Sequence, residues 1–299
     1  PLASAWGFFI PLYSMKYLVS LFKNLLPVDW VILIYNITIL IFLSLAGSKI
    51  TESGYFILIH WLIIGWVFSL SWSNGVRKTK LNQWLRTWYP IFVLIWFIPE
   101  IALFQKFYIL RNFDPEILLV ETTLFPQRYY FTMPLELSLI ALELFHSIIT
   151  SFFILLILPV LLAKKKAGSI IKEYVFVLAF SIIIHLLISL LLPVKGPSDL
   201  RLELFPEGTF FIPLVNFITK SYFQSGGTVS SLFVTIGVII VAYVSKLFPK
   251  VHRLMILWLF LLLISTVICT FHYSVSAMAG MLTGLLFLAG GKKLYEKLL

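Results

Sequence analysis

Eight stretches of about 20 predominantly apolar residues run through this chain, and they leave few folds open to it. About 20 apolar residues in a helix cross the roughly 30 Å hydrocarbon core of a bilayer. Backbone polar groups at that depth must be satisfied within the segment, which favours helices. We therefore expect an all-α, polytopic transmembrane bundle with about eight spans, at 28–47, 54–72, 87–105, 134–163, 174–194, 228–247, 254–272 and 273–290.

Composition supports the membrane interpretation. Of 299 residues, 60% are apolar and 12% are charged, and the mean hydropathy is +1.00. A soluble domain of this size could not cover such a surface with polar groups. Cys269 is the single cysteine, which leaves no disulfide framework and no cysteine-based metal site. We expect no cofactor.

The formal charge of +10 could indicate a nucleic-acid partner, but its distribution argues against one. Most of the 23 Lys and Arg residues fall between spans on one side, around 77–86, 164–172, 246–253 and 292–297. This asymmetry is typical of cytoplasmic loops. We therefore expect both termini in the cytoplasm and membrane lipids, rather than nucleic acid, as partners. Residues 1–27 are expected to form an amphipathic interfacial segment.

Two segments near the C-terminus carry chemistry-bearing residues. They are Gln224–Ser231, which reads QSGGTVSS, and Ser265–Gly280, which contains His272 and Ser276. Together they resemble the second and third signature motifs of the type-2 phosphatidic acid phosphatase superfamily, PSGH and SRxxxxxHxxxD. The segment 192–197, LPVKGP, is similar to the first signature region of the inositol phosphorylceramide synthase-like branch. The resemblance covers about two-thirds of the chain, from the third span onward.

The resemblance implies a six-helix core at 87–299, preceded by two transmembrane helices at 28–86. It places His272 at the nucleophile position. Gly227 stands where the family has its acid histidine, and Ser276 stands where it has the aspartate that orients the nucleophile. Loss of an orienting carboxylate has cost ~10⁴ in turnover in a protease triad, and general acid assistance is worth roughly 10²–10⁴. Both departures predict impaired catalysis.

The resemblance also implies a phosphate-binding set made of Lys195, Arg201, Ser225 and Gly226. Lys195 and Arg201 resemble the family's Lys…Arg pair, although five residues separate them instead of six. The amides of Ser225 and Gly226 could face an anion at a helix start. The alternative is that Lys195 and Arg201 are interfacial anchors and that His272 is a hydrated histidine at a helix end.

Ionisable residues within the spans also require an explanation, because they are costly in lipid. Glu143-x-x-His146, with Glu136 seven residues earlier, is similar to half of a di-metal carboxylate site. A matching Glu-x-x-His on another helix is absent from the sequence. We therefore predict a hydrogen-bonded buried pair and no metal site.

The leading interpretation is an integral membrane protein that is catalytically impaired. It would bind a lipid phosphate at its non-cytoplasmic face or act as a subunit of a membrane complex. The alternative is an active lipid phosphatase or phospho-headgroup transferase that uses His272 as nucleophile with a rearranged acid. A third possibility is that Gly227 or Ser276 was engineered to trap a substrate. A transporter is less expected, since no paired broken helices are evident.

Overall fold

The structure is a computed structural model that describes residues 22–46, 53–76, 79–108, 112–162, 168–205, 208–220 and 227–299. The chain forms two compact units, residues 1–90 and 91–299. Most of the predicted interfacial segment 1–27, together with Ser225 and Gly226, lies outside the described residues.

Helices dominate the fold, which confirms the all-α membrane class. Of the described helices, six are long and apolar enough to cross a bilayer. They are α2 (Pro27–Ala46), α3 (Ser53–Val76), α7 (Leu139–Leu162), α8 (Gly168–Leu191), α12 (His252–Ile268) and α13 (Ser274–Leu298). The other two expected spans coincide with α4 (Lys80–Tyr108) and α11 (Leu232–Leu247). α11 is apolar but only 16 residues long.

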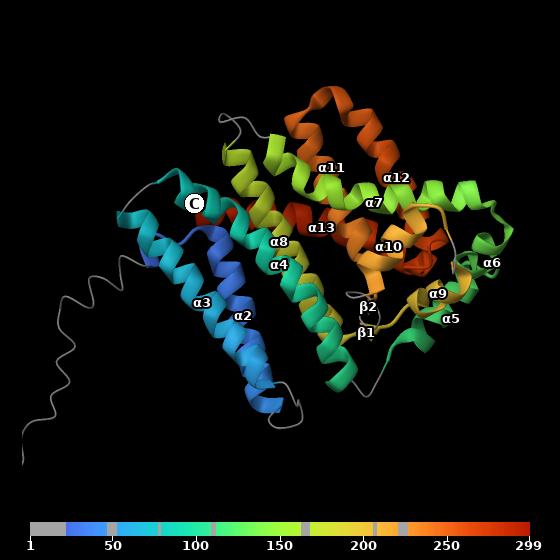
Figure 1. Cartoon of the computed structure of the whole chain (residues 1–299), viewed down its shortest axis with the longest axis horizontal. Coiled ribbons are helices and arrows are strands. Elements are labelled where there is room, and N and C mark those ends of the chain that lie inside the picture. The colour runs from blue at the N-terminus through green and yellow to red at the C-terminus, as the bar shows by residue number, and fades with distance from the viewer. Residues whose placement is uncertain are drawn as a thin grey trace, which may run out of the picture. The chain divides into compact units, whose positions relative to one another are not determined.

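In the first unit, α2 and α3 lie side by side (Figure 1). The carboxylate of Asp29, near the start of α2, accepts hydrogen bonds from Arg86 and Tyr89 on α4. Arg86 also donates to the Leu70 carbonyl of α3 over 3.2 Å. One buried ion pair thus joins three helices.

In the second unit, α11 and α13 pack against each other unusually closely. A Cβ atom on Gly280 would lie 2.7 Å from the Ser231 carbonyl oxygen, and one on Gly284 would lie 2.8 Å from Cβ of Val238. Only glycine permits this approach, and small residues four apart are the usual solution for helix pairs in membranes. The contact fixes the start of α13 beside the start of α11.

The two long connections between spans contain secondary structure of their own. The first, between α4 and α7, contains α5 (Asp114–Leu124) and α6 (Tyr129–Glu136). The expected span 134–163 is therefore wrong at its start, because Leu137 is extended (ψ 146°) and ends α6 before α7 begins. The helix α7 is correspondingly shorter than the expected span.

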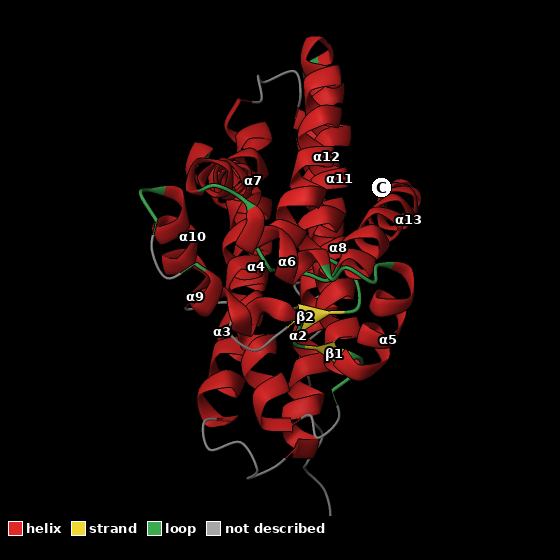
Figure 2. Cartoon of the chain, turned by 90° about the vertical axis from the view of Figure 1, so that its right-hand side faces the viewer, coloured by secondary structure: helices red, strands yellow, loops and turns green. Residues whose placement is uncertain are grey.

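The second connection contains two short strands among helical turns. The strands are β1 (Pro193–Val194) and β2 (Gly227–Thr228), which Figure 2 shows in yellow. Between them lie η3 (Pro197–Leu200), α9 (Arg201–Leu204) and α10 (Phe211–Lys220). The turn η4 (Pro249–Val251) joins α11 to α12. α12 ends at Ile268, so residues 269–273 form a turn that the expected spans 254–272 and 273–290 did not allow for.

Candidate functional site

Three segments that are distant in the sequence meet in the second unit. β1 pairs antiparallel with β2, which places Val194 opposite Gly227. The Ser231 amide at the start of α11 donates to the Ser276 carbonyl of α13 over 2.8 Å. The segments 192–197, 227–231 and 269–276 therefore border one region.

Gly196 brings the first of these segments against the third. It has a left-handed backbone (φ +73°), and a Cβ atom there would lie 3.3 Å from the Phe271 carbonyl oxygen. Both conditions favour glycine. A larger residue would push the 192–197 segment away from the turn that precedes α13.

The turn at 269–273 has a strained backbone at Thr270. Thr270 has φ 52°, which is rare for a β-branched residue. The amides of Phe271 and His272 both donate to the Thr266 carbonyl, over 2.9 and 3.1 Å. Such strain costs about 1–3 kcal/mol and is concentrated at functional sites. It is therefore a reason to look for a function at this turn.

His272, the predicted nucleophile, is half-buried and packs edge-on against Phe233, with 6.1 Å between the ring centroids. Among the described residues, no side chain or carbonyl makes a hydrogen bond to its imidazole. Burial, assisted by the nearby His185, lowers the pKa of His272 to about 3. The ring is neutral at physiological pH, and no group in this part of the structure selects its tautomer.

The two degenerate motif positions give His272 no support. Ser276 is fully buried, yet its hydroxyl has no hydrogen-bond partner in the described structure, so it does not orient the imidazole. Gly227 contributes only backbone, in β2. The resemblance-based roles of these positions therefore stay predictions.

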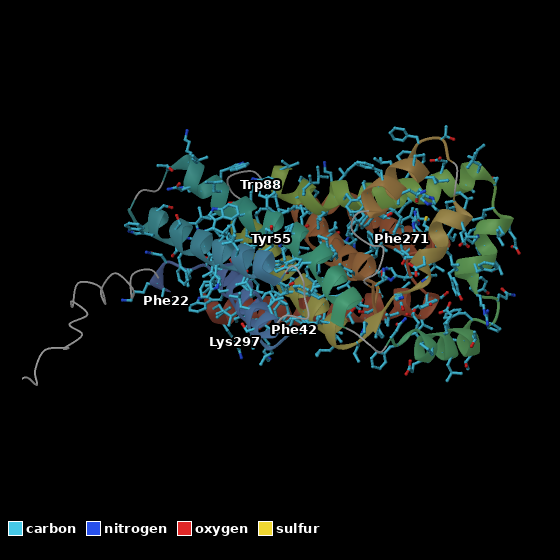
Figure 3. The ribbon with its side chains drawn as sticks, turned by 60° about the horizontal axis from the view of Figure 1, so that its bottom comes forward. Phe22, Phe42, Tyr55, Trp88, Phe271 and Lys297 are labelled. Carbon is cyan, nitrogen blue, oxygen red and sulfur yellow. The ribbon has the colours of Figure 1, made fainter. Side chains whose placement is uncertain are left out.

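Arg201 is buried beside this turn. Its guanidinium donates to the Cys269 carbonyl and, over 2.8 Å, to Asn216. The Phe271 side chain, labelled in Figure 3, presents its ring 4.0 Å from the guanidinium carbon. Burial lowers the pKa of Arg201 to about 10, so the group stays cationic at neutral pH. Within the described residues, no carboxylate lies within 4 Å of it to form an ion pair.

Lys195 is placed differently, because its side chain is exposed. Its backbone amide and that of Gly196 donate to the two carboxylate oxygens of Asp114, over 2.8 and 2.9 Å. Tyr273 donates its hydroxyl to the same carboxylate over 2.9 Å. Asp114 thus ties α5 to both the first and the third segment.

Glu121, two helical turns after Asp114 on α5, likewise accepts backbone amides of another segment. It is fully buried and accepts the amides of Ser274 and Val275, at the start of α13, over 3.1 and 2.8 Å. The seven-residue spacing of Asp114 and Glu121 places both on one helix face. That spacing was the available signal, but it does not show which amides the carboxylates meet.

His185 is the other group that motif reasoning did not place in the site. It lies on α8, is fully buried, and its Nε2 is 2.5 Å from the Thr228 hydroxyl of β2. Thr228 lies three residues before Ser231, whose amide donates to the Ser276 carbonyl, so this contact brings His185 to the same region as the turn that carries His272. The sequence signal was a histidine within a span, two helical turns before the 192–197 segment.

An apolar cavity of about 310 Å³ adjoins these polar groups. Its walls come from α4, α7, α8, α10 and α11, and every lining residue is Ile, Leu or Phe. Phe233 belongs to the lining and also packs against His272 and Phe271. One aromatic ring therefore separates the apolar space from the polar turn.

Glu143 and His146 do not form the predicted pair. The Glu143 carboxylate accepts four amides at the start of α10, from residues 209–212, at 2.5 to 3.3 Å. His146 instead contacts the Leu142 carbonyl at 2.7 Å and Arg201 at 3.5 Å. A helix start attracts a carboxylate more strongly than a neutral imidazole does.

Across the described ranges, no three His, Cys, Asp or Glu side chains are grouped as metal ligands. No family model matches the sequence, and no curated protein or solved structure shows significant similarity to it.

Proposed function

We propose that this membrane protein binds an anionic lipid, with the headgroup phosphate at the 269–276 turn, in a fold related to the type-2 phosphatidic acid phosphatases. The observation that carries the proposal is the buried guanidinium of Arg201 without a carboxylate among the described residues. Burying a charge without a counter-charge is expensive. A phosphate at this place would supply the missing charge.

The neighbourhood of Arg201 supports a phosphate ligand. Charge-assisted bonds between guanidinium and phosphate are short, directional and strong. The buried hydroxyls of Thr270, Ser274 and Ser276 have no partner in the described structure and could donate to phosphate oxygens. Buried polar groups are normally satisfied, so unsatisfied ones indicate a water, ion or ligand.

The apolar cavity supports a lipid rather than a soluble phosphate. Its volume is at the lower end of small-molecule sites, and its purely apolar lining suits a hydrocarbon chain. A chain that leaves the cavity past Phe233 would carry its headgroup to the polar turn. Six described helices are long and apolar enough to cross a membrane, which supports a lipid as the ligand of this cavity.

Binding without turnover is favoured by the state of the three motif positions. His272 has no group in the described structure to orient it, and Gly227 has no side chain to donate a proton. Ser276 does not bond to the imidazole. We therefore propose a catalytically impaired protein whose anion site is retained.

The test is lipid binding by the full chain in nanodiscs. Mass spectrometry of co-purified lipids should show retained anionic phospholipid, and added phosphatidic acid should bind more tightly than diacylglycerol of the same chains. Arg201→Gln should weaken binding about 10-fold or more, while Arg253→Gln, an exposed arginine at the start of α12, should not. Equal binding of both lipids would overturn the proposal.

The second candidate is an active phosphatase or phosphotransferase that uses His272. The strained Thr270 turn, which positions His272, is the observation in its favour. Under the leading proposal the chain shows little hydrolysis or headgroup transfer, and Gly227→His with Ser276→Asp raises activity more than either change alone. His272→Ala should then abolish the gain. Strong turnover by the unaltered chain would favour the second candidate.

The proposed topology has eight spans and a six-helix core, with both termini in the cytoplasm and the site on the opposite side. A single reactive cysteine placed in loop 164–166 should be labelled by an impermeant reagent only from the cytoplasmic side. A cysteine at Asp199, in η3, should be labelled only from the other side. The reverse pattern would invert the orientation.

A further inference from the structure

The interior of the site holds two histidines from different elements, His185 on α8 and His272 in the turn before α13. Neither imidazole has a carboxylate hydrogen-bond partner in the described residues. Three unpartnered, buried hydroxyls, those of Thr270, Ser274 and Ser276, lie on the same turn and helix start as His272. This is a polar interior without a negative charge of its own beside the rings.

The hydrogen bonds of Thr228 define the state of His185. The Thr228 hydroxyl donates its one proton to the Ser230 carbonyl, so it must accept at its oxygen from His185 Nε2, which lies 2.5 Å away. Nε2 therefore carries a proton. With no carboxylate to compensate a charge, a fully buried imidazole is neutral, and Nδ1 carries a lone pair.

The other charged groups on the turn do not change this conclusion. Arg201 contacts the Cys269 carbonyl and the Phe271 ring, and it adds positive charge. The two carboxylates, Asp114 and Glu121, come from α5 and are occupied by backbone amides and by the Tyr273 hydroxyl. An added proton on either histidine would thus meet Arg201 and the other ring before any free anion.

We propose that His185 is a binding residue of this site and that His185 and His272 together take up a proton when an anionic headgroup enters. The inference rests on the proposed function and adds a residue and a mechanism to it. A neutral histidine pair gives an anion little attraction, whereas a protonated pair supplies a positive charge beside Arg201. Anion binding and protonation therefore favour each other, and the affinity for an anion rises as pH falls.

The experiment needs a probe whose own charge does not change. A phosphate monoester titrates near pH 6, so we choose the phosphodiester dioctanoyl phosphatidylglycerol. Its binding to the full chain in phosphatidylcholine nanodiscs is measured by calorimetry between pH 8 and 5.5, in two buffers that differ in ionisation enthalpy. Uptake of one proton should tighten binding by up to about 10-fold per pH unit, and the two buffers should give different heats.

Variants assign the proton. His185→Gln and His272→Gln should each flatten the pH dependence and reduce the buffer-dependent heat. His252→Gln removes an exposed histidine at the start of α12 and should leave both unchanged. If His185→Gln does not fold, ring ¹⁵N shifts of the wild-type histidines with and without lipid report the same protonation, and an unchanged His185 shift would overturn the proposal.

The two proposals fail in different ways. Phosphatidylglycerol binding that is tight but independent of pH, with equal heats in both buffers, would overturn proton coupling and leave the anion site in place. No binding of either phosphatidylglycerol or phosphatidic acid at any pH would overturn the anion site itself. Loss of pH dependence in His252→Gln alone would assign the proton outside the site and contradict the role of His185.

Discussion

Each of the two units buries an arginine, and the two side chains differ in whether they have a carboxylate partner among the described residues. Arg86, in the first unit, bonds to the carboxylate of Asp29, which also accepts from Tyr89. Among the described residues, Arg201, in the second unit, has as hydrogen-bond partners only the neutral Cys269 carbonyl, Asn216 and His146. The two arginine residues are 5% and 4% exposed, respectively.

The difference suggests a structural role for the charge of Arg86 and, under the proposed function, a ligand-binding role for the charge of Arg201. A guanidinium neutralised by its own chain joins helices and has no need of an outside anion. A guanidinium with neutral partners keeps its attraction for one, at the expense of stability. The contrast is the reason to place function at Arg201 and architecture at Arg86.

The largest effect should follow from breaking the neutralised pair. Asp29→Asn removes the carboxylate and leaves the Arg86 guanidinium buried and uncompensated, which should lower the free energy of unfolding by about 3–5 kcal/mol. Denaturation of the purified protein in detergent measures this loss. Asp199→Asn, at an exposed carboxylate, is the matched control and should change stability little. Equal losses in the two variants would remove the distinction between the arginines.

Removing the Arg201 side chain should change stability little but weaken lipid binding. Arg201→Met takes away a cation that has no carboxylate partner in the described part of the chain, so stability should stay within about 1 kcal/mol of wild type or rise, as when buried ionic groups are replaced by apolar ones. Anionic-lipid binding should weaken about 10- to 100-fold, the equivalent of a charged hydrogen bond of roughly 1.5–3 kcal/mol. Severe destabilisation with unchanged binding would make Arg201 a structural residue like Arg86.

The sequence predicts the long apolar helices well, but it does not predict which groups the two arginines contact. Apolar runs predict helices wherever lipid forbids open backbone, and six described helices agree. The break at Leu137, by contrast, depends on how α6 and α7 pack and was missed. The partners of Arg86 and Arg201 are set by tertiary contacts across 57 and 68 residues, which no local pattern encodes.

The site shows the same limit. The motif segments at 192–197, 227–231 and 265–280 could be recognised because their residues are close in sequence. Glu121 and His185 could not be placed, since neither belongs to a motif, and the contacts of Asp114 with the amides of Lys195 and Gly196 depend on tertiary packing. The predicted Glu143–His146 pair was wrong for a related reason, because the amides at the start of α10 lie 66 or more residues away.

A smaller change can convert one arginine environment into the other. Asn216 lies 2.8 Å from the Arg201 guanidinium, so Asn216→Asp would give Arg201 the carboxylate that Arg86 already has. Anionic-lipid binding should then weaken about 10-fold, since an internal anion competes with the ligand. Asn112→Asp, at an exposed asparagine, controls for added negative charge. Undiminished binding by Asn216→Asp would show that Arg201 does not attract the headgroup.

The smallest expected effect is the change of the free energy of unfolding with pH. It depends on His272, whose imidazole has no carboxylate partner among the described residues. The pKa of His272 is lowered from its usual 6.5 to about 3 by burial and by His185. Below pH 6.5 the unfolded chain therefore binds a proton that the folded chain refuses, so the free energy of unfolding falls as pH decreases from 6.5 toward 3. Because His272 is only half-buried, the slope should be less than the limit of about 1.4 kcal/mol per pH unit. Unfolding curves from pH 7.5 to 5 measure it, and His272→Gln should reduce the slope while His252→Gln should not. Saturating anionic lipid should reduce it too, because a bound anion favours the protonated ring. If neither His272→Gln nor lipid changes the slope, protonation of His272 does not contribute to the pH dependence of stability. The lack of a carboxylate partner would then matter for Arg201 but not for the histidines.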